Sequence, residues 1–179
     1  MLYEEDFTQA VAQVYKYARD NRLSYGSTDR SYPVGSDGII DCTGLILRAL
    51  WSLGLVSGPL NCDQMDQLLP SLGFKISYDG NIRKAHATIS QWCFPQNYGT
   101  EHINHTCYDL RLYSDGTVDR YDLGNQNRWL YDTQPYSHVE DNMWRNSDGS
   151  VRYVNQHYFW LPRHEERGDD AEGFFIELG

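Results

Sequence analysis

The residues of this chain best suited to covalent chemistry are Cys42 and His105. Cys42 lies where a loop rich in Gly, Ser, Tyr and Asp meets an apolar stretch, within the residues 40–44, IDCTG. A helix that begins there would stabilise a thiolate through its unpaired N–H groups, and the thiolate is the nucleophilic form of cysteine. Such a nucleophile needs a base within reach, and His105 opens a later stretch with strand character.

The spacing of apolar residues predicts three helices in the first part of the chain. The first covers residues 5–20 and is amphipathic, and the second covers 43–53 and is apolar on most faces, which predicts burial. Gly54 is a natural end for the second helix, and a short third helix is expected from about Asp63 to Pro70. We expect the buried second helix to aim Cys42 at the surface without burying it.

After Gly73 the period changes from that of helices to that of strands. Alternation predicts strands at 74–78 and 88–94, a β-hairpin from 105–113 and 117–123, and a last strand at 153–161. Helices followed by strands describe an α+β domain, which we expect to cover residues 1–164. The charged residues 165–179 are expected to form a poorly ordered tail.

A catalytic histidine also needs an orienting partner, and the strand after His105 offers two carboxylates. Asp119 and Asp122 are three residues apart and therefore lie on opposite faces, so only one can reach the imidazole. His102 is a rival for the base. His102, His105 and Cys107 also suggest a zinc site, but such spacing on a strand points the ligands in mixed directions and no second Cys/His pair completes the site.

Composition excludes several classes of partner. With 15 basic and 25 acidic residues the formal net charge is −10, which argues against binding to nucleic acid or anionic lipid. No apolar run approaches the roughly 18–20 residues of a membrane span. The first six residues are acidic where a secretory signal is basic, so we expect synthesis in the cytoplasm. The four cysteines form no CxxC pair, so at least one thiol is expected to be free.

Two segments resemble the NlpC/P60 cysteine peptidases. Residues 41–46, DCTGLI, are similar to that family's Asp-Cys-Ser-Gly-Leu/Phe-Val motif, and residues 105–110, HTCYDL, are similar to the strand that begins with its catalytic histidine. The resemblance is closest to the bacteriophage peptidoglycan hydrolases. In these a helix, a Tyr-containing loop, the Asp-Cys motif, a short helix and a Gly-Phe/Tyr strand follow one another, as residues 17–25, 41–46 and 65–74 do here.

The resemblance implies a papain-like α+β core in which the nucleophile helix packs on an antiparallel sheet. It also implies that Cys42 is the nucleophile, that His105 is the base, and that Asp119 is the orienting residue with Asp122 as the alternative. Tyr25, with Tyr32 as a rival, and Asp41 match positions that contact the substrate near the scissile bond. The chain departs from the family at residues 87–92, where a Gly-Asp pair is replaced, and in the greater length of its hairpin.

The function that the resemblance implies is cleavage of an amide bond in peptidoglycan, either within the stem peptide or between muramic acid and L-alanine. The protein would act as a monomer, without metal or organic cofactor. It would reach the bacterial cell wall after release, either during phage lysis or as part of a virion. Two alternatives remain open. The same Cys-His pair could serve a toxin or acyltransferase acting on another amide, or the fold could be a non-catalytic wall-binding or virion module.

Overall fold

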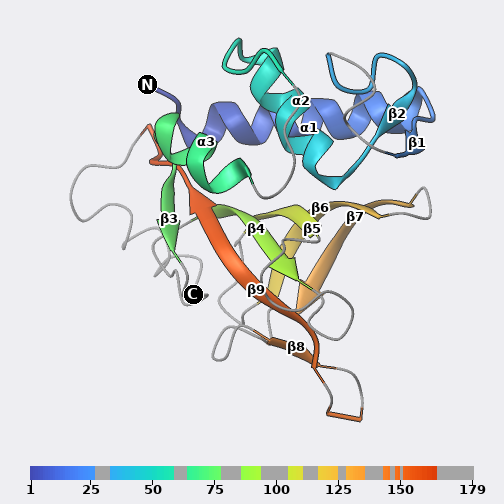
Figure 1. The fold of residues 1–179 in the computed structure, drawn as a ribbon, viewed down its shortest axis with the longest axis vertical. Coiled ribbons are helices and arrows are strands. Elements are labelled where there is room, and N and C mark those ends of the chain that lie inside the picture. The colour runs from blue at the N-terminus through green and yellow to red at the C-terminus, as the bar shows by residue number, and fades with distance from the viewer. Residues whose placement is uncertain are drawn as a thin grey trace.

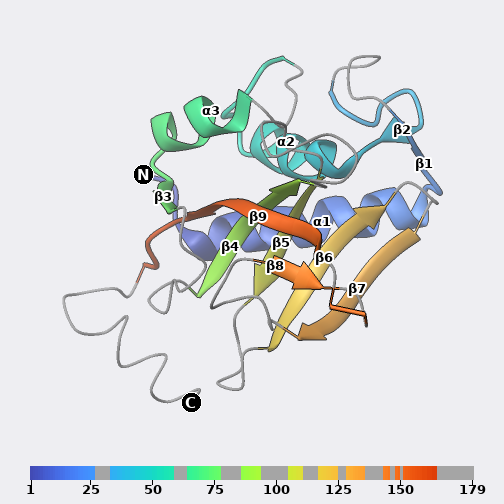
Figure 2. The same cartoon turned by 60° about the horizontal axis from the view of Figure 1, so that its bottom comes forward.

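The computed structural model describes residues 1–26, 33–58, 64–77, 86–93, 105–110, 117–124, 128–135, 143–145, 148–149 and 151–164; residues 92–93, 117, 124, 128–135, 143–145 and 151–157 are described as backbone only. Within these residues, three helices lie on one side of an antiparallel sheet (Figures 1 and 2). The predicted α+β class is confirmed. The helices are α1 (Glu4–Asp20), α2 (Cys42–Ser52) and α3 (Met65–Ser71).

The first two helices have the predicted positions and the predicted buried faces. In α1 the buried apolar residues recur at helical spacing: Phe7, Ala10, Val11, Val14 and Ala18. α2 is buried along most of its length, and its chain turns out of the helix at Gly54, whose φ is +75°. α3 begins at Met65 rather than near Asp63, which lies outside the described residues, and it contains Pro70 in its last turn.

The main sheet has the strand order β3-β9-β4-β5-β6-β7, with β8 paired to β9. Five strands match predicted ones: β3 (Lys75–Ser77), β4 (Ala87–Cys93), β5 (His105–Leu110), β6 (Thr117–Gly124) and β9 (Val151–Trp160). Strands β7 (Arg128–Pro135) and β8 (Met143–Arg145) were not predicted, nor was the short parallel pair of β1 (Ser24–Tyr25) and β2 (Ile39–Ile40). The predicted turn at 114–116 and the tail at 165–179 lie outside the described residues.

The core lies between the helices and one face of the sheet. Phe7 of α1 makes edge-on ring contacts with Phe74 and with Tyr108 of β5, and Tyr15 makes another with Tyr121 of β6. Beside α1, the side chains of β5 and β6 that face the helix are therefore those that share a pleat with Tyr108 and Tyr121. This register determines which residues of β5 and β6 lie on the opposite face.

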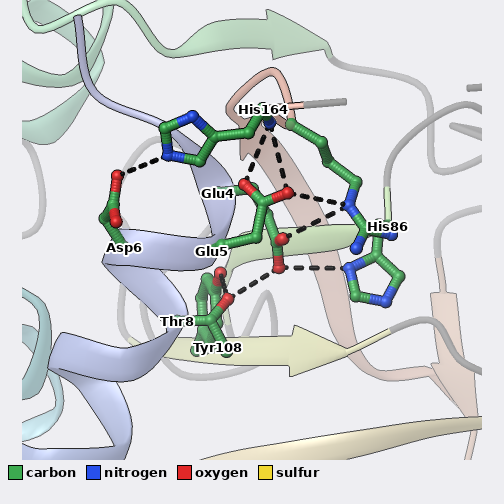
Figure 3. A network of polar contacts seen from close by, with 8 residues as sticks. Glu4, Glu5, Asp6, Thr8, His86, Tyr108 and His164 are labelled. Carbon is green, nitrogen blue, oxygen red and sulfur yellow. Dashed lines mark hydrogen bonds and ion pairs between the residues drawn. The ribbon is translucent and has the colours of Figure 1, made fainter. Parts of the chain in front are cut away.

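A polar network joins the first turn of α1 to the end of β9 (Figure 3). The buried carboxylate of Glu4 accepts a hydrogen bond from Thr8 at 2.7 Å, lies 3.1 Å from Nδ1 of His86 and pairs with Arg163 at 3.8 Å. Burial alone would raise the pKa of Glu4, but the hydrogen bonds from His86 and Thr8, together with nearby positive charge, hold it below its ordinary value. The residues that follow β9 are thereby fixed to the first helix.

Candidate active site

Cys42 is the first residue of α2, and the helix start is defined by Asp41. Asp41 has an extended backbone, and its Oδ1 accepts a hydrogen bond from the backbone N–H of Gly44 at 2.7 Å. The side chain therefore acts as an N-cap that fixes the first turn. Because the remaining N–H groups of that turn point out of the helix end, they place positive potential beside the sulfur of Cys42.

The sulfur is more buried than the sequence suggested. Cys42 retains only 5% of its accessible surface, and Thr43 and Gly44 beside it are buried as well. The expectation that the helix presents Cys42 without burying it is therefore wrong. The reason is that side chains from two distant segments, Tyr25 and His105, pack against the sulfur and hydrogen-bond to it.

His105 is the first residue of β5, and it connects Cys42 to a carboxylate. Its Nε2 lies 2.5 Å from Oδ1 of Asp122, and its side chain also hydrogen-bonds to Cys42. With Nε2 directed at the carboxylate, Nδ1 is the ring nitrogen left for the thiol. Burial alone would lower the pKa of His105, but the charges on Asp122 and Cys42 and the hydrogen bonds to both raise it to about 10.

The carboxylate at the imidazole is that of Asp122, not that of Asp119. In the β5–β6 register Asp109 lies opposite Arg120, and these two side chains are hydrogen-bonded, so the even-numbered residues of β6 share a face with His105. Asp119 is opposite Leu110, on the other face. The expectation that Asp119 orients His105 is corrected, and the alternative, Asp122, takes its place.

Asp122 is suited to this role because it stays ionised. Burial alone would raise the pKa of Asp122, but the charge and hydrogen bond of His105 and the charge of Arg120 lower it below its ordinary value. An ionised carboxylate at Nε2 fixes the ring tautomer and stabilises the imidazolium. Cys42, His105 and Asp122 thus form a row in which each member hydrogen-bonds to the next.

Tyr25 is a second residue that contacts Cys42. The pairing of β1 with β2 sets Tyr25 beside Ile40, two residues before the cysteine. The hydroxyl of Tyr25 hydrogen-bonds to both the side chain and the backbone of Cys42. Burial, followed by negative charge on Cys42 and Asp41, raises the pKa of Tyr25, so the phenol keeps its proton and remains a donor at the helix start. Its rival, Tyr32, lies outside the described residues.

The row that begins at Cys42, as far as the structure describes the chain, includes neither another cysteine nor His102, the alternative base. Cys107 is fully buried, as expected for a core residue, and both Cys42 and Cys107 are free thiols, which confirms that at least one thiol is free. His102 and Cys62 lie outside the described residues, and Cys93 is described as backbone only. Within the part of the chain that the structure describes, no group of three or more His, Cys, Asp or Glu side chains is placed to hold a metal ion.

Sequence reasoning missed one buried ion pair that lies next to the site. Arg120 of β6 and Asp109 of β5 are directly opposite in the hairpin, and both are almost fully buried. The sequence feature that could have indicated this ion pair is that Arg120 and Asp109 lie inside two strands predicted to pair. It was not decisive, because a shift of one residue in register would have placed the two side chains on opposite faces.

No family model matches the chain, and a search of curated proteins finds no match either. No helix among the described residues has the length and apolar character needed to cross a membrane. The geometry of Cys42, His105 and Asp122 and the motif resemblance are therefore the two grounds for assigning a function.

Proposed function

We propose that this chain is a cysteine amidase or endopeptidase of the NlpC/P60 type, with a papain-like core, that cleaves an amide bond in peptidoglycan. The observation that carries the proposal is the double contact of His105, whose ring hydrogen-bonds to Cys42 at the start of α2 and to the ionised carboxylate of Asp122. A nucleophile, a base and an orienting group in this order are the requirements for covalent acyl transfer.

The residues define a two-step reaction. The Cys42 thiolate attacks the carbonyl carbon of the scissile amide, and His105 as imidazolium protonates the leaving nitrogen, so that an amine departs and a thioester remains. His105, now neutral, removes a proton from water, which attacks the thioester carbonyl carbon. The C–S bond then breaks, so that the carboxylic acid is released and Cys42 returns to the thiolate beside the imidazolium. Asp122 holds the ring through both steps.

Two kinds of donor are available for the oxyanion that forms in each step. The backbone N–H groups of the first turn of α2 are already oriented by the Asp41 cap. The hydroxyl of Tyr25 is protonated and lies at the same helix end. Donors fixed before the reaction stabilise developing negative charge without reorganisation, which is commonly the largest contribution to such catalysis.

Peptidoglycan as the substrate is supported by the motif resemblance at residues 41–46 and 105–110. The net charge of −10 gives no long-range attraction to anionic walls, so binding would depend on contacts near the scissile bond. The retained Cys-His pair favours an enzyme over a non-catalytic module of the same fold.

Digestion of purified peptidoglycan tests the proposal. The parent protein should release muropeptides with new amino termini, identified by mass spectrometry, whereas Cys42→Ala should release none. Tyr17→Phe is the control, because it removes a hydroxyl on the exposed side of α1 and should leave the digest unchanged. Intact peptidoglycan after incubation with a folded parent protein would overturn the substrate assignment and favour a toxin or acyltransferase acting on another amide.

A further inference from the structure

A buried ion pair adjoins the proposed catalytic row and has no role in the two-step reaction. Nε of Arg120 donates to Oδ1 of Asp109 at 2.6 Å, and a terminal nitrogen of the same guanidinium donates to Oδ2 at 3.1 Å. The side chains are 6% and 0% exposed, respectively. Removing two charges from water carries a large desolvation cost, so a pair in this position is weak evidence for stability alone.

Asp109 is held by more than the arginine. The hydroxyl of Ser90 donates to Oδ2 of Asp109 at 2.9 Å, the thiol of Cys107 donates to Oδ1 at 3.6 Å, and Thr88 hydrogen-bonds to Ser90 at 3.1 Å. These contacts come from β4 and β5, so the carboxylate is fixed from two neighbouring strands. Because the contact with Arg120 is bidentate, the fixed carboxylate also orients the guanidinium.

Arg120 and Asp122 lie on the same face of β6, two residues apart, and each influences the ionisation of the other. The groups that lie beside one another are therefore imidazolium, carboxylate, guanidinium and carboxylate, which alternate in charge. Cys107 also faces Asp122, and Cys42, itself in contact with Tyr25, faces His105 from the helix side.

The alternation explains why a pair occurs here rather than a single arginine. A lone guanidinium beside Asp122 would favour the ionised carboxylate but would also repel the imidazolium of His105. The negative charge of Asp109, which is bonded to the guanidinium, offsets part of that repulsion. The arrangement supports Asp122 at little cost to His105.

We propose that Arg120, fixed by Asp109, is a positioning residue that places a positive charge on the same face of β6 as the Asp122 carboxylate and so supports the contact by which Asp122 orients His105. The inference concerns the same site as the proposed function and deepens it. Its test needs no substrate, so its failure and the failure of the peptidoglycan assignment can be distinguished.

The experiment follows the Asp122 carboxyl carbon by NMR over an acid titration in the intact protein. Replacing both charges in Asp109→Asn/Arg120→Met should move the Asp122 midpoint to higher pH, because the guanidinium that favours ionisation is gone. Asp109→Asn alone should move it to lower pH, because Arg120 then acts without a counter-charge. Arg120→Lys should restore most of the parent value, since the charge is kept and only the bidentate contact is lost.

The rate of Cys42 alkylation gives a second readout. The ratio of the rate at about pH 4.5 to that at about pH 7.5 should fall severalfold in the double variant and recover in Arg120→Lys. Shifts of opposite sign for the double variant and for Asp109→Asn support the proposal. Folded variants with lower melting temperatures but an unchanged Asp122 midpoint and alkylation ratio would overturn it, because that pattern is the one expected of a purely structural ion pair.

Discussion

Nε2 of His105 and Oδ1 of Asp122 lie 2.5 Å apart, although the two residues come from different strands and their Cα atoms are not paired in register. The two side chains are diagonal neighbours on one face of the hairpin, where long side chains can reach each other. It gives the imidazole a fixed orientation and an adjacent negative charge, and it leaves the other ring nitrogen for Cys42.

This contact predicts different effects for the two carboxylates of β6. Asp122→Asn keeps the shape of the side chain but removes the charge that stabilises the imidazolium, so peptidoglycan cleavage should fall by about 10²-fold or more. Asp119→Asn is the matched control on the opposite face and should retain most of the parent rate. Rates of muropeptide release decide the matter, and a greater loss in Asp119→Asn would return the orienting role to that residue.

The raised pKa of His105 predicts an alkaline limit for the reaction. Because the pKa is about 10, His105 remains protonated across neutral pH and can supply the proton to the leaving nitrogen. Cleavage should therefore persist into the alkaline range and decline as the pH approaches 10. In Asp122→Ala, burial without the counter-charge lowers the pKa of His105, so the decline should occur at lower pH. An unchanged profile would contradict the assignment.

The same shift makes a prediction for stability, and its sign follows from linkage. The folded protein holds the His105 proton more tightly than the unfolded chain, whose histidine has the ordinary value of 6.5. The stabilisation is therefore fully present below about pH 6.5 and is lost as the pH rises to about 10. Denaturant titrations should show this loss in the parent protein and little of it in His105→Gln.

Tyr25 is expected to affect the rate more than the binding of substrate. Tyr25→Phe removes the hydroxyl that contacts the side chain and backbone of Cys42, so kcat should fall by roughly tenfold to a hundredfold while KM changes little. Tyr17→Phe, on the exposed side of α1, is the control. A rise in KM with kcat unchanged would instead assign Tyr25 to substrate binding in the ground state.

Asp41 has a structural contribution that can be measured separately. Asp41→Ala removes the cap on Gly44 and should lower the free energy of unfolding by about 0.5–2 kcal/mol, whereas Asp41→Ser should retain most of it. Chemical denaturation of the parent protein and of the two variants measures these free energies of unfolding. Equal stability of Asp41→Ala and the parent would show that the capping contact contributes nothing.

The sequence predicted the elements that carry strong periodic signals. The helical spacing of Phe7, Val11 and Val14 located α1, and the continuous apolar run after Cys42 located α2 and its burial. The strands β7 and β8 escaped detection because residues 128–135 and 143–145 mix polar, aromatic and charged residues without clear alternation. Strand pairing in the sheet supplies what the local pattern lacks.

The site itself could be predicted only in part. Cys42 and His105 could be assigned because each begins an element with a recognisable pattern. The choice between Asp119 and Asp122 depends on the register of β5 against β6, and a shift of one residue exchanges the faces. The burial of Cys42 depends on Tyr25 and His105, which reach it from segments remote in sequence. Local patterns carry no information on either point.

The most direct test of the proposed nucleophile is the rate at which iodoacetamide alkylates each cysteine at neutral pH, resolved by mass spectrometry of peptides. Cys42 should react fastest despite its 5% exposure, because His105 and the helix start favour its thiolate, and His105→Ala should slow that reaction by about tenfold or more. Cys107, buried beside Asp109, should react slowly in both proteins. Alkylation of Cys42 that is no faster than that of Cys107, or that is unchanged in His105→Ala, would contradict a Cys42–His105 catalytic pair.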